Sequence, residues 1–177
     1  MHFMLFETAL GPCGVVWNEH GLTGVHLPDA NHARTRAGVT RRFPDASPAE
    51  PPPAVRDAID GIGALLRGEK RDLRDIALNF DGVPAFNRRV YELARTIPPG
   101  ATMTYGDIAL RLAMPGTARA VGQALGQNPW PIVVPCHRVL AADGGMGGFS
   151  APGGVATKRR MLEIEGVEGV RAEPRLF

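Results

Sequence analysis

A cysteine followed directly by a histidine is the pair of residues in this chain best suited to chemistry. Cys136 supplies a thiol and His137 an imidazole, in the Pro-Cys-His-Arg-Val segment at residues 135–139. A thiol with a pKa of about 8.5 is mostly protonated at neutral pH, and burial makes ionisation harder. A buried nucleophilic cysteine therefore needs a base. Because neighbouring residues on a strand point to opposite faces, we expect His137 to act through a bridging water. A buried, inert cysteine is the alternative interpretation.

An imidazole that acts as a base needs a third group to orient it, and Glu165 is the candidate. It ends a helix that we predict over residues 155–165. The stripe expected to face the site consists of Val155, Arg159, Leu162 and Glu165.

A β-branched run at residues 132–134 precedes the cysteine and predicts a short buried strand. Pro131 and Pro135 bracket the run, so its position is fixed and its end is abrupt. We therefore expect Cys136 to lie at the floor of a site, away from any mobile tip.

Two short helices, over residues 105–112 and 117–126, are predicted ahead of this segment, with a tight turn at residues 113–116. Thr104, with an acidic residue three positions later, and Thr117 are the expected N-caps. The lengths are typical of a helix-turn-helix, although many helical hairpins bind nothing.

The second of these helices is rich in small residues, and Arg119 is its one charged side chain. Small side chains allow close packing against a neighbouring helix, and they also allow close approach to a narrow DNA groove. In the second case, Arg119 is the long side chain available to enter the base stack. The small residues are Ala118, Ala120, Gly122 and Ala124.

The N-terminal part reads as a small sheet with a helix. Strands are expected at residues 3–8, 13–18 and 22–27, an irregular proline-rich loop at 44–53, a helix at 54–67 and a further strand at 75–80. A helical stripe at residues 86–94 opens a second unit. We therefore predict an α+β chain: an N-terminal α/β domain over residues 1–80, with an antiparallel sheet, and a mainly helical C-terminal domain over residues 84–170.

Composition adds weaker constraints. The 177 residues are 44% hydrophobic, with no apolar run of the roughly 18 residues needed to span a bilayer and no signal peptide, so we expect a cytoplasmic protein. Residues 1–84 carry 9 basic and 11 acidic side chains, whereas residues 85–177 carry 11 and 7. The positive half contains the motifs above, which weakly favours a polyanionic partner.

Neither a disulfide framework nor a metal site is expected. Cys13 and Cys136 are the two cysteines, far apart in the chain, and no Cys/His cluster has ligand spacing. A metal held near Cys13 by His20, His26 and His32 is the disfavoured alternative. No cofactor is predicted.

Together, these residues resemble the O6-alkylguanine-DNA alkyltransferases, also called methylated-DNA–protein-cysteine methyltransferases. Residues 135–139 are similar to the active-site signature of that family. The resemblance runs in the family's order from about Phe86 to Gly166, and the N-terminal half is similar only in general character. The other matching segments are residues 97–100, 104–109, 119–122, 128–129 and 165–166.

The resemblance implies catalytic roles. Cys136 would accept the alkyl group in one stoichiometric transfer, with His137 as base through a water and Glu165 holding the imidazole. Tyr105 would contact the flipped base and the rotated phosphate, and would donate a proton to the departing guanine. The implied partner is double-stranded DNA carrying O6-alkylguanine, bound by a monomer.

The resemblance also implies residues that contact DNA. Arg119 would fill the gap left by the flipped nucleotide, and Asn128 would brace the turn that carries the cysteine. The carbonyls of Cys136 and Val139 would accept hydrogen bonds from the guanine amino group, while the Ser150 amide would face its O6. The pocket walls would be Leu125, Pro131 and Phe149.

The sequence departs from the family pattern in several places. Phe149 stands where a tyrosine is expected, and the Gly-rich loop at residues 148–154 is about two residues longer than usual. Residues 86–91 lack the usual Gln and Trp, and the zinc cluster of some eukaryotic members has no counterpart. These changes leave the preferred alkyl group open.

Two other classes of protein are compatible with parts of this pattern. Alkyltransferase-like proteins bind alkylated DNA without catalysis, but they replace the cysteine that this chain retains at Cys136. A non-catalytic, damage-sensing binder of alkylated DNA that keeps its cysteine is the alternative function, because the Gly-rich loop is altered. A Cys-His hydrolase unrelated to DNA leaves Arg119, the small-residue helix and the Asn-Pro turn unexplained.

Overall fold

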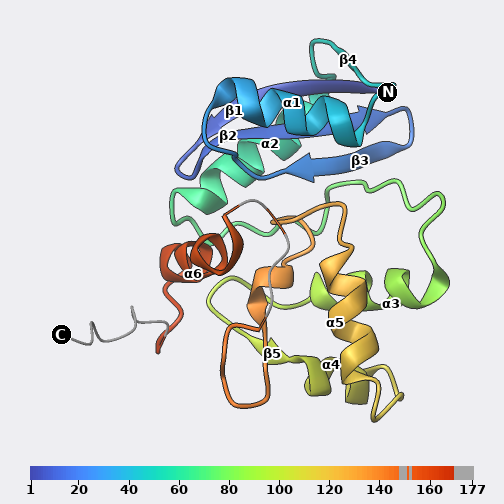
Figure 1. Cartoon of the computed structure of the whole chain (residues 1–177), viewed down its shortest axis with the longest axis vertical. Coiled ribbons are helices and arrows are strands. Elements are labelled where there is room, and N and C mark those ends of the chain that lie inside the picture. The colour runs from blue at the N-terminus through green and yellow to red at the C-terminus, as the bar shows by residue number, and fades with distance from the viewer. Residues whose placement is uncertain (148–150, 152, 170–177) are drawn as a thin grey trace.

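The computed structural model describes residues 1–147, 151 and 153–169, and it consists of a sheet layer stacked on a helical layer (Figure 1). In the sheet layer, β1 (His2–Thr8), β2 (Gly11–Asn18) and β3 (Gly21–His26) are antiparallel neighbours, as predicted. The short β4 (Ser47–Pro48) pairs parallel to β1 and completes the order β3-β2-β1-β4. Two residues of the segment predicted to be irregular therefore join the sheet.

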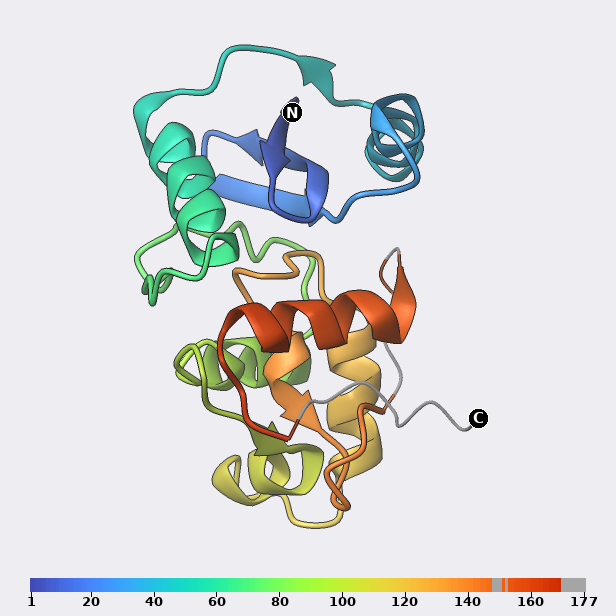
Figure 2. The ribbon, with the colours of Figure 1, turned by 90° about the vertical axis from the view of Figure 1, so that its left-hand side faces the viewer.

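Two helices cover opposite faces of this sheet (Figure 2). The predicted helix is present as α2 (Pro53–Leu66). The other, α1 (His32–Arg42), was not predicted, because its buried residues are Thr35, Gly38 and Val39 and leave no apolar stripe to recognise. Asn31 caps it by accepting a hydrogen bond from the Arg34 amide.

The alternation along β2 explains why both faces are covered. Val15 and Trp17 belong to the main core together with residues of α2, whereas Val16 packs with Phe3 and Val39 on the α1 side. A sheet buried on both faces needs apolar residues at successive positions, and residues 15–17 supply them.

The helical layer is built from α3 (Ala85–Ala94), α4 (Tyr105–Arg111), α5 (Ala118–Gly126) and α6 (Gly154–Ile164). Between α5 and α6 the chain forms the short 3-10 helix η1 (Cys136–Arg138) and β6 (Val139–Leu140), which pairs parallel with β5 (Met103–Thr104). The Tyr91 hydroxyl ties α3 to α5 by donating to the Ala124 carbonyl at 2.6 Å. The α+β class predicted from the sequence is confirmed.

One of the two predicted helix caps is present. Thr104 and Asp107 form a reciprocal capping box at the start of α4, with bonds of 3.0 and 2.9 Å. Thr117 occupies the N-cap position of α5, as predicted, but its side chain does not cap the helix. Its hydroxyl donates back to the Met114 carbonyl at 2.6 Å, so it stabilises the preceding turn instead.

Trp130 joins the helical layer to the sheet layer. Its indole N–H donates to the Leu22 carbonyl at 2.8 Å, and its ring packs edge-on against Phe80 and Tyr91. Beside it, the Val25 amide donates to the Pro129 carbonyl at 2.9 Å. A single hydrophobic core runs through both layers as a result.

The strand predicted over residues 75–80 is wrong. The segment touches β3 at one bridge, between Leu22 and Leu78, and tight turns bend it on either side. Within the described ranges, no helix is long and apolar enough to cross a membrane, and no group of three or more His, Cys, Asp or Glu side chains is arranged to hold a metal.

The bond from Trp130 to Leu22 gives a measurable expectation. We expect Trp130→Phe to lower the free energy of unfolding by about 1 kcal/mol more than Trp17→Phe does. This difference is the net contribution of one intramolecular hydrogen bond. Trp17 is also buried, and its indole N–H makes no hydrogen bond to any residue that the structure describes, so the control carries the volume loss alone. Urea unfolding measures both, and equal losses would contradict the anchoring role.

Candidate active site

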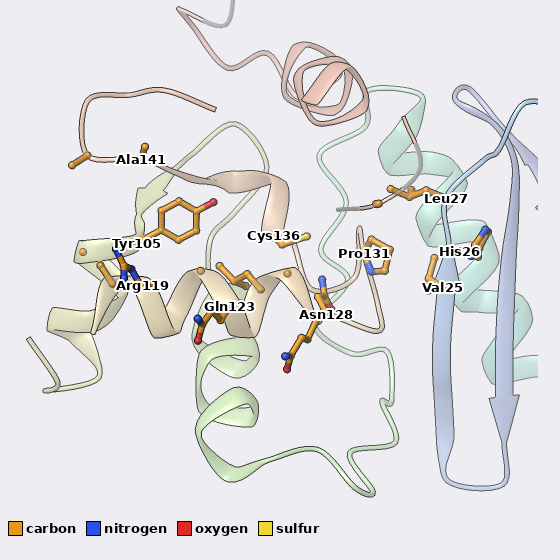
Figure 3. Close-up of a pocket in the computed structure, with 18 of the residues that line it drawn as sticks. Val25, His26, Leu27, Tyr105, Arg119, Gln123, Asn128, Pro131, Cys136 and Ala141 are labelled. Carbon is orange, nitrogen blue, oxygen red and sulfur yellow. The ribbon is translucent and has the colours of Figure 1, made fainter. Parts of the chain in front are cut away.

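A cavity of about 1060 Å³ lies between the end of β3 and α5, with Cys136 in its wall (Figure 3). Its two sides come from different layers, since residues 25–27 face Tyr105 and Arg119 across it. Of the predicted site residues, the cavity brings together Tyr105, Ala118, Arg119, Gly122, Leu125, Asn128, Pro131 and Cys136.

The other predicted site residues lie elsewhere. Ala120 and Val139 do not line the cavity, and His137 and Glu165 are buried behind the cysteine. Phe149 and Ser150 lie outside the described residues. Sequence reasoning did not name Gln123 or the wall contributed by the first half of the chain, which includes residues 25–27 and Arg42.

The segment that carries the cysteine is a tight turn, and the strand predicted over residues 132–134 is wrong. Ile132 has a φ of 78°, in the left-handed region, which reverses the chain so that Pro131 and Val134 bridge each other. A β-branched residue in this conformation is strained and must be held by its surroundings. Cys136 then begins η1 in place of ending a strand.

Asn128 holds this turn from within. Its Nδ2 donates to the Val134 carbonyl at 2.9 Å, and its Oδ1 accepts from the Trp130 amide at 2.9 Å. Both bonds are buried, so the Asn128 amide replaces backbone pairing that the turn cannot make for itself. The structure thus places Asn128 at the base of the turn, where the resemblance put it.

The environment of Cys136 keeps its thiol protonated in the resting protein. The cysteine is free and 8% exposed. Burial raises the pKa of the Cys136 thiol, while a hydrogen bond with Asn128 and the positive charge of Lys158 act in the opposite direction. Because burial is the larger effect, nucleophilic attack by this sulfur requires removal of a proton.

The position of His137 and its uncharged state are those that a general base requires. The Nε2 to Glu165 Oε1 distance is 2.8 Å, and because an ionised carboxylate can only accept, Nε2 carries the ring proton. Nδ1 is left as an acceptor, buried and without a partner among the described residues. Burial lowers the pKa of His137 and the hydrogen bond to Glu165 offsets this only partly, so the ring is neutral at pH 7.

Arg138 fixes the carboxylate that orients His137, a role that sequence reasoning did not assign. Its Nε and Nη2 donate to the two oxygens of Glu165 at 2.9 and 2.7 Å, and Nη1 donates to the Ile97 carbonyl at 2.7 Å. Burial alone would raise the pKa of Glu165, but the hydrogen bonds from His137 and Arg138 prevail and lower it to about 2. The carboxylate is therefore ionised at any working pH.

Lys158 is a second group that sequence reasoning missed. It is fully buried on α6, and its Nζ donates to the Val139 carbonyl at 2.7 Å and lies 5.9 Å from the centre of the Tyr105 ring. Burial lowers its pKa to about 8, while Cys136 acts to raise it. Lys158 lies three and four residues before Met161 and Leu162, so all three share one face of α6. This spacing is the signal that would have placed Lys158 on the buried face.

The face of α6 that was predicted to lie against the site is correct only toward its C-terminal end. Leu162 is buried and Glu165 reaches His137, but Val155 is 36% exposed. The buried face instead begins at Lys158.

Tyr105 stands at the start of α4, where the capping box fixes the backbone beside the cavity. Burial and the neighbouring Cys136 raise the pKa of the Tyr105 hydroxyl, which therefore keeps its proton at neutral pH. The site thus combines a protonated thiol, a neutral imidazole base and a phenolic proton donor around one cavity. This arrangement suits nucleophilic substitution by sulfur on a group held in the cavity.

Similarity to known proteins agrees with this chemistry. The model of the family described as "6-O-methylguanine DNA methyltransferase, DNA binding domain" matches residues 85–167. A methylated-DNA–protein-cysteine methyltransferase of Methanothermobacter thermautotrophicus is 39% identical over 154 residues, which cover 87% of this chain and 79% of the relative. The chain belongs to the methylated-DNA–protein-cysteine methyltransferase family.

The likeness to this methyltransferase family includes the sheet layer. A member from Mycobacterium bovis is 36% identical over 93% of this chain and 92% of its own length. The crystal structure of Mycobacterium tuberculosis OGT in complex with DNA is similar with a TM-score of 0.74 and 34% identity, over 93% of this chain and 92% of that one. The first half, which resembled the family only in general character by sequence, thus shares its fold.

The ion pair behind His137 should control acid stability. The pKa of Glu165 is depressed from 4.5 to about 2. The contribution of its ionised carboxylate to the free energy of unfolding is therefore complete above pH 4.5 and is lost as the pH falls towards 2. We expect Glu165→Gln to cost about 3–5 kcal/mol at pH 7, since it leaves Arg138 buried without its counter-charge. The variant should also show a flatter loss of stability below pH 4.5.

Urea unfolding at a series of pH values measures this. Glu163→Gln makes the same change at an exposed position of α6 and should leave both quantities unaltered. A Glu165→Gln variant as stable as the native chain at pH 7 would contradict a structural role for the pair.

The charge of Lys158 should be detectable at the thiol. Because the ammonium favours the thiolate, Lys158→Met is expected to move the ionisation of Cys136 to higher pH, while Lys158→Arg preserves it. The rate of reaction with iodoacetamide against pH reports this, in a Cys13→Ala background that leaves one thiol. An identical profile for Lys158→Met and the native residue would exclude electrostatic coupling.

Proposed function

We propose that this chain repairs alkylated guanine in duplex DNA by moving the alkyl group from guanine O6 to the sulfur of Cys136. The supporting observation is the buried Cys136 at the cavity wall, backed by a neutral His137 whose free Nδ1 is the only unpartnered nitrogen of the ring in the described structure. The family to which the chain belongs is named for transfer of a methyl group from DNA to a protein cysteine.

The transfer is a substitution at the alkyl carbon. His137 Nδ1 takes the thiol proton through a bridging water, and the thiolate forms a bond to the carbon as the bond from carbon to O6 breaks. The electron pair returns to the guanine ring, which takes up a proton from the Tyr105 hydroxyl. The tyrosinate then recovers a proton from the imidazolium through solvent in the cavity, so the charges balance.

The product explains why each molecule reacts once. The sulfur of Cys136 becomes a thioether, which water does not cleave and which has no proton to give. Glu165 and Arg138 remain unchanged throughout, because their task is to keep His137 in the tautomer that accepts at Nδ1.

Reaction in duplex DNA requires the alkylated nucleotide to leave the base stack, at a cost of a few kcal/mol. In our proposal, α5 lies in the groove with the small side chains of Ala118, Ala120 and Gly122 against the DNA. Arg119 occupies the space left in the stack, which limits collapse of the duplex behind the extruded base. Support comes from the position of Arg119 at the cavity and from the relative whose structure contains DNA.

The extruded guanine would be held in the cavity by backbone and apolar groups. The carbonyl of Cys136 accepts from its amino group, and Leu125 and Pro131 form the walls. In this proposal the chain acts as a cytoplasmic monomer with residues 84–170 as its DNA-binding domain.

Mass spectrometry tests the proposal directly. After incubation with duplex DNA that contains O6-methylguanine, the peptide with Cys136 should gain one methyl group per molecule. The peptide with Cys13 is an internal control, since burial raises the pKa of that thiol to about 11 and it should stay unmodified. Binding to the lesion with no added mass would instead indicate a non-catalytic binder of alkylated DNA.

A further inference from the structure

The cavity wall opposite α5 contains a cation that the proposed reaction does not use. Arg42 lines the cavity together with residues 25–27, although it ends a helix of the sheet layer. It belongs to the half of the chain in which acidic residues exceed basic ones. The positive charge of Arg42 therefore does not follow from the overall charge of this half of the chain.

The helix that carries Arg42 has an unusual charge pattern. α1 contains no acidic residue, and its arginines are exposed at positions 34, 36, 41 and 42. Among the described residues, no carboxylate forms an ion pair with any of these four side chains, whereas Arg56 of α2 pairs with Glu50. The α1 face is thus a source of uncompensated positive charge beside the cavity.

Two of these arginines lie over different strands on the same face of the sheet. The Arg36 guanidinium lies 5.2 Å from the centre of the Phe3 ring, which belongs to β1. The Arg42 guanidinium lies 5.3 Å from the ring of Phe43, which packs so closely on Gly24 of β3 that a Cβ there would lie 2.4 Å from it. Arg42 is therefore held at the β3 side, next to the helical layer, and Arg36 is held away from it.

The acidic group beside this wall is already occupied. Asp29 lies 3.0 Å from His26 Nε2, and within the described part of the chain it forms no ion pair with Arg42. Burial is the one cause that lowers the pKa of Arg42, with no neighbouring carboxylate acting against it. The guanidinium is partly shielded by protein, is still charged at neutral pH, and has no anionic partner in the described chain.

We propose that Arg42 binds a phosphate of the DNA strand that enters the Cys136 cavity, from the side opposite α5. The inference rests on the proposed function, because it assumes that a nucleotide occupies this cavity. Any nucleotide placed there is joined on both sides to phosphates that must pass the cavity mouth. A guanidinium at that mouth offers paired N–H donors to phosphate oxygens, whereas a free base offers it no anion.

A purely structural role for Arg42 makes a different prediction. Arg41 and Arg42 occupy the last turn of α1, where positive charge stabilises the negative end of the helix dipole. In that case a substitution lowers thermal stability but leaves the salt dependence of DNA binding unchanged. The two roles are therefore separable by experiment.

The test is the salt dependence of binding to a duplex that contains one O6-methylguanine, measured by fluorescence anisotropy in a Cys136→Ser background that prevents transfer. The slope of log K against log salt concentration changes by about 0.9 for each phosphate contact. We expect Arg42→Gln to weaken binding about three- to tenfold at low salt and to reduce the slope by about 0.9. Arg42→Lys should keep the native slope, and Arg36→Gln, which removes the same charge from the same helix, should keep both slope and affinity.

A native slope in Arg42→Gln, or an equal loss in Arg36→Gln, would overturn the phosphate contact. The native chain, with Cys136 intact, is tested separately by mass spectrometry for methyl transfer from O6-methylguanine in duplex DNA. Failure of that transfer would overturn the proposed function while leaving the slopes interpretable, so the two failures are distinct.

Discussion

The ionised carboxylate of Glu165, buried between an imidazole and a guanidinium, is the interaction on which the site depends. Burying such a pair is costly, and an apolar replacement would often serve stability equally well. What an apolar side chain could not do is dictate which nitrogen of His137 carries a proton. By accepting from Nε2, Glu165 leaves Nδ1 as the basic atom, and Arg138 keeps the carboxylate charged while it does so.

The rest of the helical layer is arranged around that pair. Arg138 is anchored to the Ile97 carbonyl, so the segment after α3 is tied to the back of the site. α6 brings Glu165 and Lys158 to the same region from one helix face, seven residues apart. The two groups have opposite charges and different partners. Glu165 accepts from the imidazole of His137, and Lys158 lies against the Val139 carbonyl and the Tyr105 ring.

Sequence patterns predicted the elements whose burial follows a simple period. The antiparallel strands, α2, α3 and the capping box of α4 belong to this group. The pattern failed where burial and residue type disagree. α1 has a thin apolar face, and Lys158 is a charged residue in a buried position.

The prediction of a strand before Cys136 failed for a different reason. Residues 132–134 are β-branched and apolar, which normally indicates a strand, yet Ile132 adopts a left-handed conformation imposed by Asn128 and the flanking prolines. Such a conformation depends on tertiary contacts that a short window of sequence does not contain. The same limit applies to the cavity wall from residues 25–27, because it comes from the other layer.

The attachment of Pro129 and Trp130 to β3 makes the position of the reacting sulfur depend on both halves of the chain. β3 is hydrogen-bonded to the turn that leads to Cys136, so the sheet layer helps to set where that turn lies. An insertion between α5 and Cys136 would displace these contacts. A first half exchanged between relatives would have to preserve the bonds of β3 to residues 129 and 130.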